Sequence, residues 1–560
     1  MRMWAAAVLS AALLELPFPL ASPMPPWRSI FAWFGLVPLL WALLNPATVD
    51  HPRPFRRAFL ISYLCGVLWY MGNCYWVRDT MMRYGDMPTG APTLLLIGYS
   101  LVLGLYFGLF GLGVMLVRRA TGNQHFALAT APFLWVALDL AAARITSVPW
   151  DQLGYSQVDN GLAMALAPWT GVYGLSFILV AANAAFVGLV MAGVRTESSR
   201  VGRGLFTSQL ALAFACSMLA SGFGTIAFQR AHPSPTAATA VLIQPNLDVG
   251  GDNDWAGPGE WDKHIADFTR LASEQCKTYV AGIPQTGAGS GEIICPPYPT
   301  HPDLVVWPES PAPFFESNPR FQSAIAAIAQ SDKSPLIVGG LAADLSPQNE
   351  EHDYNAAMVI APDGNFIGRY EKIHLVPFGE YVPFAEYLTF AHKLTGRVSA
   401  FSRGTERKTF RLNGHRYGIF ICYEAVFADE VRHFAQLGAE VLVNISDDGW
   451  YGDTSAPWQH LNMARMRAIE NRRWLLRDTN NGVTAVIDPY GRVRQSIPRH
   501  QIDALPAQYG FREDITFYTA HGDVFAWLCA ILSLGMVGWS FKANLRKINL
   551  PLATQNKVRS

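Results

Sequence analysis

Long apolar segments fill most of the first 230 residues of this 560-residue chain, and they limit its fold more than any other feature. A helix that crosses a membrane needs about 20 mainly apolar residues to span the hydrocarbon core. Eight segments approach or reach this length: 3–22, 29–46, 58–77, 93–117, 126–143, 169–194, 206–228 and 523–541. We therefore expect a polytopic α-helical membrane protein with about eight transmembrane helices, seven of them within residues 1–230.

Two of these segments admit a second interpretation. The first is interrupted by Glu15 and two prolines and could be a secretory signal, although Ala21-Ser22-Pro23 is a poor cleavage site. Asp139 lies inside the fifth segment, where a carboxylate is costly and often functional. We favour the simpler interpretation, in which Asp139 lies near the end of a tilted helix beside Arg144.

Positive charges in the short loops predict how the chain is oriented in the membrane, because cytoplasmic loops carry an excess of Lys and Arg. With the N-terminus in the cytoplasm, the cytoplasmic segments hold fourteen Lys and Arg residues and the opposite short loops hold five. Seven crossings then place residues 230–522 outside the cytoplasm. The last segment, 523–541, returns the chain and leaves residues 542–560 as a basic cytoplasmic tail.

The overall composition excludes several classes of partner and site. The chain is 51% hydrophobic and 15% charged, whereas a soluble globular protein usually carries about 25% charged residues. Its formal net charge is zero, so no basic field favours a nucleic-acid partner. The seven cysteines are scattered without a Cys-x-x-Cys pair or a zinc-type spacing, which argues against a structural metal.

From Thr239 the pattern changes from long apolar segments to short strands and amphipathic helices. Expected strands are 240–244, 304–307, 335–339, 355–361, 366–370, 416–422, 441–445, 484–488 and 493–496, and expected helices are 261–275, 321–330, 429–437 and 458–471. Strands that alternate with helices in this way predict a layered α/β domain, which we place at residues 239–515.

Three polar residues with catalytic potential stand at distinctive places in this domain. Cys422 follows an apolar strand at a turn that would lift a thiol out of the sheet, and a thiolate is a strong nucleophile. Glu309 follows another apolar strand and could act as a base. Lys372 could stabilise a thiolate and an oxyanion. Each alone is more often an inert or solvated residue, so only their combination favours catalysis.

The segments around these residues resemble a known superfamily. WPES at 307–310, YEKIHLVPFGEYVP at 370–383 and ICYEAVF at 421–427 look like the three signature segments of the nitrilase, or carbon–nitrogen hydrolase, superfamily. The membrane segments narrow the resemblance to the bacterial apolipoprotein N-acyltransferases. Further segments resemble that family and extend the likeness over nearly the whole chain: 148–157, 171–177, 243–246, 444–470, 477–488 and 517–523.

The resemblance implies a fold and a catalytic triad. Members of the family carry an α-β-β-α sandwich on the periplasmic side of the inner membrane. Carried over to this sequence, Glu309 would be the general base, Lys372 the oxyanion stabiliser and Cys422 the nucleophile. No cofactor takes part in this scheme, and the chain would lie in the bacterial inner membrane as a multi-pass protein.

Four further residues are implied to support this site. Glu380 matches a second glutamate that the superfamily uses beside its triad. Tyr423 and Glu424 follow the cysteine as they do in the family. Trp450 matches an aromatic residue near the mouth that binds the acyl chain.

The reaction implied by the resemblance has two steps. The thiolate of Cys422 would attack the acyl ester of a phospholipid, typically the sn-1 chain of phosphatidylethanolamine, and form a thioester. The α-amine of a lipoprotein's diacylglyceryl-cysteine would then attack the thioester and leave as an N-acylated lipoprotein. A thioester is activated toward amines, and two steps allow two bulky lipids to use one site in turn.

Two segments near the triad carry expectations of their own. Residues 276–300 form an extra loop-like segment, in which Cys276 and Cys295 either pair in an oxidising compartment or stay unpaired. Phe384–Leu394 is amphipathic and aromatic, and it is either a membrane-facing lid beside the site or an ordinary core-packed helix.

Two rival functions fit parts of this pattern. A membrane-anchored nitrilase-type amidase would use the same triad on a small C–N substrate with water as the second nucleophile, but an anchor needs only one span. A transporter or sensor would only bind a ligand in the α/β domain, and the complete Glu–Lys–Cys set argues against it.

Overall fold

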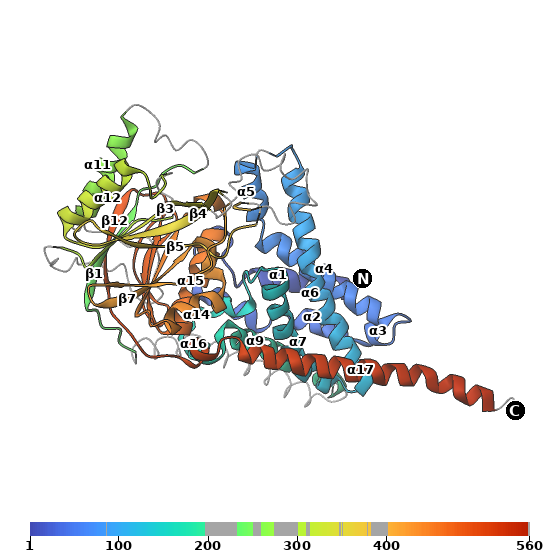
Figure 1. Ribbon diagram of the computed structural model, residues 1–560. Helices are drawn as coiled ribbons and strands as arrows, with labels where there is room; N and C mark the ends of the chain where they lie inside the picture. Colours follow the sequence, from blue (N-terminus) through green and yellow to red (C-terminus); the bar gives the residue numbers. More distant parts are fainter. Residues whose placement is uncertain are drawn as a thin grey trace.

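The computed structural model describes residues 1–85, 87–196, 232–249, 259–273, 301–309, 314–345, 349, 351–377, 379–381 and 401–557, with backbone alone for 192–196 and 547–557. These residues form two parts, a bundle of helices and a two-sheet sandwich that lies against one end of it (Figure 1). The last helix of the chain returns from the sandwich and runs along the bundle.

The helical part combines long apolar helices with short connecting turns. Its elements are α1 (Arg2–Glu15), η1 (Pro26–Trp33), α2 (Val37–Leu44), α3 (Pro46–Val49), α4 (Pro54–Asn73), α5 (Trp76–Tyr84), α6 (Ala91–Thr121), α7 (Gln124–Ile145), η2 (Leu153–Gln157), α8 (Gly161–Met164), α9 (Ala167–Thr196), α16 (Phe517–His521) and α17 (Val524–Lys557).

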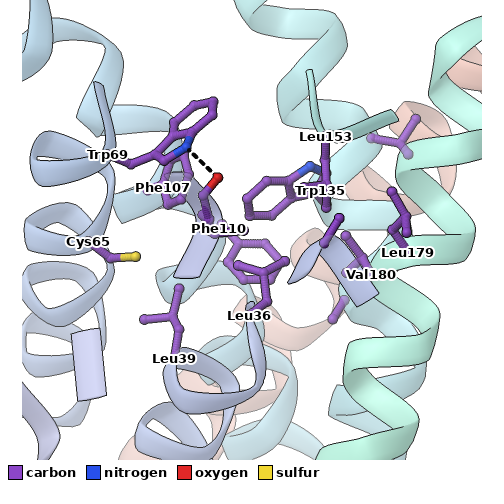
Figure 2. Packing of buried hydrophobic residues seen from close by; sticks show 14 of the residues in the cluster. Leu36, Leu39, Cys65, Trp69, Phe107, Phe110, Trp135, Leu153, Leu179 and Val180 are labelled. Atoms are coloured by element: carbon purple, nitrogen blue, oxygen red, sulfur yellow. Dashed lines mark hydrogen bonds between the residues drawn. The ribbon is translucent and has the colours of Figure 1, made fainter. Parts of the chain in front are cut away.

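Small residues allow α4 and α6 to pack closely. A Cβ at Gly104 would lie 2.6 Å from the side chain of Val67, and one at Gly108 would lie 2.6 Å from the ring of Phe59. Glycines four residues apart on one helix face permit such contact between helices in a membrane. Next to this contact, Trp69, Phe107, Phe110 and Trp135 fill the centre of the bundle (Figure 2). The indole Nε1 of Trp69 donates a 3.2 Å hydrogen bond to the carbonyl of residue 14.

The predicted count of eight transmembrane helices is not supported. Within the described residues, five segments are long and apolar enough to cross a membrane: Pro26–Leu44, Ala91–Thr121, Gln124–Ile145, Ala167–Met191 and Val524–Arg546. A sixth results if Pro54–Asn73 and Trp76–Tyr84, which meet at a 47° bend, form one broken span. The segment expected at 206–228 lies outside the described residues.

The first predicted span is too short for a crossing helix. Its helix, α1, ends at Glu15 after 14 residues, which corresponds to about 21 Å at the usual rise per residue. The hydrocarbon core is about 30 Å thick. Pro17 lies directly after the C-cap and cannot continue the helix, because it lacks the main-chain N–H.

Asp139 does not lie beside Arg144 in an ion pair. Arg144 Nη2 instead pairs with Asp523 at 2.6 Å and with Asp429 at 2.9 Å. Asp139 lines a small cavity between the helices together with aromatic and apolar side chains, among them Trp69 and Trp150. Asp139 therefore lies in the last turns of α7, as the simpler interpretation expects, but it forms no ion pair with Arg144.

The sandwich contains two six-stranded sheets. The first has the strand order β12-β1-β2-β3-β4-β5, and the second has the order β11-β10-β9-β8-β7-β6. The strands are β1 (Ala238–Gln244), β2 (Leu304–Val306), β3 (Leu336–Leu345), β4 (Glu351–Ile360), β5 (Phe366–Glu371), β6 (Thr409–Leu412), β7 (His415–Ile421), β8 (Val441–Ser446), β9 (Trp474–Thr479), β10 (Thr484–Ile487), β11 (Val493–Ile497) and β12 (Asp503–Tyr509).

Helices cover the outer face of each sheet. Along the first sheet, residues such as Val241 and Val305 pack against α11 (Glu260–Ser273) and α12 (Pro319–Asp332). Their neighbours, such as Leu242 and Val306, point to the second sheet, because successive side chains of a strand face opposite sides. On the far side, α14 (Ala428–Gln436) and α15 (Ala456–Asn471) cover the second sheet and lie next to the helical bundle (Figure 1). The expected α-β-β-α sandwich is therefore present.

Parallel strands at the centre of each sheet bring their carboxyl ends to one edge. In the first sheet β1, β2 and β3 are parallel, and β5 runs in the same direction as β3 because each is antiparallel to β4. In the second sheet β7, β8 and β9 are parallel. In layered α/β folds, ligands bind outside the carboxyl ends of such strands.

Candidate active site

Cys422 lies directly after β7, at the start of the 3-10 turn η3 (Cys422–Val426). Its φ of +48° is in the left-handed region, which a side chain with a Cβ rarely adopts. This turn breaks the strand direction and brings the thiol to the carboxyl edge of the sheet. The residue is only 5% exposed. Cys422 therefore stands at the turn after a strand, as expected, and its role as nucleophile stays a prediction.

Glu309 follows β2 and reaches the same place from the opposite sheet. Its Oε1 accepts hydrogen bonds from Lys372 Nζ at 2.8 Å and from Asn355 Nδ2 at 2.8 Å. Its Oε2 accepts one from the main-chain N–H of Asp447 at 2.9 Å. The Glu309 carboxylate and the Cys422 thiol lie close enough for each to shift the pKa of the other. The three predicted triad residues thus meet in one buried cluster.

Lys372 and Asn355 each bridge two carboxylates. Lys372 Nζ donates to Glu309 Oε1 and, at 2.9 Å, to Glu380 Oε1. Asn355 Nδ2 donates to the same two atoms, at 2.8 Å in both cases. The other oxygen of Glu380 accepts from the main-chain N–H of Val376 at 2.8 Å. The ammonium offsets the repulsion between these two carboxylates.

Electrostatics fix the protonation state of the cluster. Burial acts to lower the pKa of Lys372, but Glu309 and Glu380 raise it well above its ordinary value. Burial acts to raise the pKa of Glu309, but the charge and hydrogen bond of Lys372 outweigh burial and lower it. Burial and the Glu309 carboxylate raise the pKa of the Cys422 thiol well above its ordinary value. At neutral pH the cluster therefore holds a carboxylate, an ammonium and a neutral thiol.

Glu424 connects η3, the turn that begins at Cys422, with the segment that carries Lys372. Its Oε2 accepts from the main-chain N–H of Ile421 at 2.7 Å. Its Oε1 accepts from the N–H of Ile373 at 2.7 Å and from the hydroxyl of Tyr370 at 2.9 Å. Burial raises the pKa of Glu424 to about 7. Glu424 thus holds the main chain next to Cys422 and next to Lys372. These contacts fit the supporting role predicted for Glu424.

Tyr423 and Trp450 contact the helical part of the chain. The hydroxyl of Tyr423 donates to the carbonyl of Ser147 at 3.1 Å, and its ring stacks on Trp150 with centroids 6.4 Å apart. Trp450, in the 3-10 turn η4 (Asp448–Tyr451), is 43% exposed and packs edge-on against Tyr84, with centroids 5.0 Å apart. The role predicted for Trp450 in acyl-chain binding stays a prediction.

Several groups of the cluster were not predicted from the sequence. Asn355 stands in the middle of β4 with no neighbouring motif that indicates a polar role. Asp447 contributes its main-chain N–H, and burial together with the Glu309 charge raises the pKa of its side chain to about 8. Ser446, at the end of β8, donates to Asp448 Oδ1 at 2.9 Å and lies close enough to Cys422 to act on the pKa of its thiol. The available signals were the position of Ser446 and Asp447 at a strand end and their place in segment 444–470, which resembles the family.

Other expectations fall outside the described residues. The extra segment 276–300, with Cys276 and Cys295, is one, and the segment Phe384–Leu394 is another. Among the described residues, no group of three or more His, Cys, Asp or Glu side chains is placed to hold a metal ion.

Comparisons with known proteins match both parts of the chain. Residues 10–185 match the model of the apolipoprotein N-acyltransferase N-terminal domain, and residues 292–505 match that of the carbon–nitrogen hydrolases. Saccharomyces cerevisiae Nit3, a nitrilase superfamily member of known structure, aligns over 52% of this chain and 96% of its own at 17% identity and a TM-score of 0.35.

Curated relatives match nearly the full length. The apolipoprotein N-acyltransferase of Geobacter metallireducens is 34% identical over 93% of this chain and 92% of that protein. The enzymes of the same name from Vibrio cholerae and Chlorobaculum tepidum are 30% and 28% identical, over 91% and 95% of this chain and 94% of each relative. The chain therefore belongs to the apolipoprotein N-acyltransferase family and joins a carbon–nitrogen hydrolase domain to a set of apolar helices.

Proposed function

We propose that this chain transfers an acyl chain from a phospholipid, through a thioester on Cys422, to the N-terminal amine of diacylglyceryl-cysteine in apolipoproteins. The observation that carries the proposal is the buried cluster of Glu309, Lys372 and Cys422 in a chain of this family. The proposed donor is a phospholipid such as phosphatidylethanolamine, with its sn-1 chain as the group that moves.

The protonation states support a first step with a built-in base. Cys422 is a neutral thiol at rest, and Glu309 is a carboxylate close enough to the thiol to shift its pKa. As the sulfur attacks the ester carbonyl carbon, the thiol proton passes to Glu309. The tetrahedral intermediate then breaks its C–O bond, and Glu309 returns the proton to the departing lysophospholipid oxygen. A thioester and a carboxylate remain.

The second step reverses these roles. The acceptor amine attacks the thioester carbonyl carbon, Glu309 takes a proton from the amine, and the C–S bond breaks. The thiolate that leaves regains this proton, so both Cys422 and Glu309 return to their starting states. Lys372 stays an ammonium throughout and stabilises the negative charge that develops on oxygen and sulfur. Glu380, which shares Lys372 with Glu309, holds the ammonium in place.

We also propose a topology that brings this site to a membrane surface. Residues 1–230 would carry the first transmembrane helices, 239–515 a periplasmic catalytic domain, 523–541 the last crossing and 542–560 a cytoplasmic tail of an inner-membrane protein. The excess of Lys and Arg in the predicted cytoplasmic segments supports this orientation. The hydrogen bond from Tyr423 to Ser147 supports a site next to the bundle, where lipids can reach it.

The experiment that tests the proposal looks for the acyl-enzyme. Purified full-length protein is incubated with phosphatidylethanolamine, and the peptide that contains Cys422 is weighed. We expect an added acyl mass that hydroxylamine removes and that Cys422→Ser lacks. Absence of an adduct on folded protein would refute the thioester. Loss of the adduct only on addition of a diacylglyceryl lipopeptide supports the acyltransferase, whereas equal loss in water alone favours the amidase.

A further inference from the structure

His460, on α15, contacts the turn that begins at Cys422. Its Nε2 is 3.0 Å from the main-chain oxygen of Cys422, and the side chain is fully buried. A carbonyl oxygen can only accept a hydrogen bond, so Nε2 must carry a hydrogen. His460 therefore donates to the peptide group of the residue proposed as the nucleophile.

The other ring nitrogen of His460 faces a buried ion pair. Arg477 Nη2 is 2.7 Å from Asp448 Oδ2 and 3.2 Å from His460 Nδ1, and Asp448 Oδ1 is 3.0 Å from the same nitrogen. Burial and the Arg477 charge lower the pKa of His460, and the pKa of Asp448 lies well below its usual range because Arg477 and His460 outweigh burial. The Cys422 carbonyl requires a hydrogen on Nε2, and Nδ1 lies within hydrogen-bond distance of both the Arg477 guanidinium and the Asp448 carboxylate.

Aromatic rings hold the plane of the imidazole. Trp150 stacks on it with centroids 6.0 Å apart and 23° between the planes, and Tyr451 packs edge-on at 5.9 Å. His460 is thus fixed by an ion pair on one edge and by rings beside it. Its remaining edge points at the main chain of Cys422.

The conformation of Cys422 needs such support. With φ at +48°, its Cβ is close to main-chain atoms, and residues in this region persist only where the surroundings determine them. The hydrogen bond from His460 to the Cys422 carbonyl fixes the peptide plane that follows the sulfur-bearing residue. If that plane rotates, Sγ moves relative to Glu309 and Lys372.

We propose that His460, held by Asp448 and Arg477, is a positioning residue that keeps the Cys422 thiol in reach of Glu309. This inference rests on the proposed function, since it assigns His460 a role in that same acyl transfer. His460 touches no reacting atom, and its effect passes through the main chain of Cys422.

Two amide variants separate the contacts of His460. In His460→Gln the terminal amide reaches the place of Nε2 and still donates to the Cys422 carbonyl. In His460→Asn the shorter side chain places its amide near Nδ1, where it contacts Asp448 and leaves the Cys422 carbonyl without its donor. Both variants are polar and smaller than histidine, so each is the matched control of the other.

The variants are compared in the full-length protein with phosphatidylethanolamine vesicles. We expect His460→Gln to form the Cys422 adduct within about 5-fold of the wild-type rate and His460→Asn to be about 100-fold slower, since a displacement near 1 Å costs that much. KM for the phospholipid should stay unchanged. The rate of His460→Asn should also rise with pH, because a thiol out of reach of Glu309 must lose its proton to solvent, whereas His460→Gln should keep the wild-type pH profile.

Alkylation of Cys422 by iodoacetamide gives a second readout that needs no acyl donor. We expect the wild type and the two variants to show the same order of rates, and the same pH profiles, as in adduct formation. Equal rates and profiles for folded His460→Asn and wild-type protein would overturn the inference, as would equal losses in both variants. If His460→Asn fails to fold, the pH profile of His460→Gln alone tests the inference. A wild-type pH profile supports the inference, and a rate that rises with pH overturns it. A wild-type protein without an adduct would instead refute the proposed function.

Discussion

At the scale of single residues, the site keeps its sulfur neutral until a substrate arrives. Burial opposes a thiolate at Cys422, and the Glu309 carboxylate opposes it further. In the proposed mechanism, the proton leaves the sulfur toward that carboxylate as the new C–S bond forms. A site that faces lipids and electrophiles gains selectivity from this arrangement, because the reactive anion is present only during the attack.

The pH dependence of acyl-enzyme formation follows from the state of Glu309. Its pKa lies below the ordinary value of 4.5, so the carboxylate is charged at every pH above that value. Protonation on the acid side removes the base, so we expect the rate to be flat from about pH 5 to 8 and to fall below this range. The measurement is the initial rate of the Cys422 adduct across pH.

Glu309→Gln tests the same assignment. This variant should lower the adduct rate by about 10²–10⁴-fold, because the general base is lost. Its remaining rate should rise with pH, as expected for an unassisted thiol. Glu406, 69% exposed at its side chain and paired with Lys408, provides the control, and Glu406→Gln should leave the rate unchanged. A wild-type rate that rises steadily between pH 5 and 8 would contradict the assignment.

The residues that the sequence predicted are those with a local signal. Cys422 and Glu309 follow apolar strands, and Lys372 stands in a distinctive segment. Asn355 and His460 carry no such signal, since one stands within a strand and the other within a helix. Their partners lie 46 and 38 residues away along the chain. Only the folded arrangement of two sheets and a helix brings them to the site.

At the scale of elements, the predicted strands were those with continuous apolar runs. β1, β2, β7 and β8 lie close to their expected positions because their residues are buried on both faces. β12 was missed because Pro506 interrupts it, and this proline is tolerated because β12 is the edge strand of its sheet. β9 was missed because buried Arg477 and Asp478 stand in it, and Arg477 pairs with Asp448 in the fold.

Glu424 joins three elements of the site, and its replacement should lower the free energy of unfolding. Its carboxylate accepts hydrogen bonds from Ile421, Ile373, His374 and Tyr370. In Glu424→Gln the amide NH₂ replaces one oxygen and points a donor at a donor. A buried hydrogen bond to a charged group contributes about 1.5–3 kcal/mol, so we expect a loss of unfolding free energy in this range.

Thermal unfolding of the purified full-length variant checks this loss. Glu424→Gln should lower Tm and also slow formation of the Cys422 adduct, because the segment with Lys372 is no longer held to the nucleophile turn. Glu406→Gln again serves as the exposed control and should keep the wild-type Tm. An unchanged Tm in Glu424→Gln would show that the contacts of this carboxylate do not stabilise the site.

At the scale of the whole molecule, the sandwich is joined to the helical bundle next to the nucleophile. Trp150 comes from the segment between α7 and η2, stacks on Tyr423 and His460, and donates through Nε1 to Gln459 Oε1 at 2.8 Å. Gln459 in turn donates to Asn73 Oδ1 at 3.0 Å, at the end of α4. The sequence showed two domains, but it gave no sign that their interface lies against the site.

This interface predicts a difference between lipid and soluble substrates. Gln459 is fully buried, and Gln459→Leu would leave the Trp150 N–H and the Oδ1 of Asn73 without these partners. Each buried polar group left unpaired costs about 1–3 kcal/mol. The sandwich would then sit less firmly on the bundle, while the cluster around Cys422, which Gln459 does not touch, would keep its geometry. The rate of Cys422 adduct formation from phospholipid vesicles should fall about 10-fold or more. A lipid can reach the thiol only when the sandwich and the helical bundle are correctly aligned.

Iodoacetamide, which diffuses to the thiol from water, should alkylate Cys422 in Gln459→Leu at the wild-type rate. Gln322→Leu, which changes an exposed glutamine on α12, should alter neither rate and controls for the loss of an amide. Equal losses in adduct formation and in alkylation would place the effect inside the site and contradict a role for the interface. Loss of the lipid reaction alone would show that the helical bundle does more than anchor the catalytic domain, because it aligns the thiol with substrates that remain in the membrane.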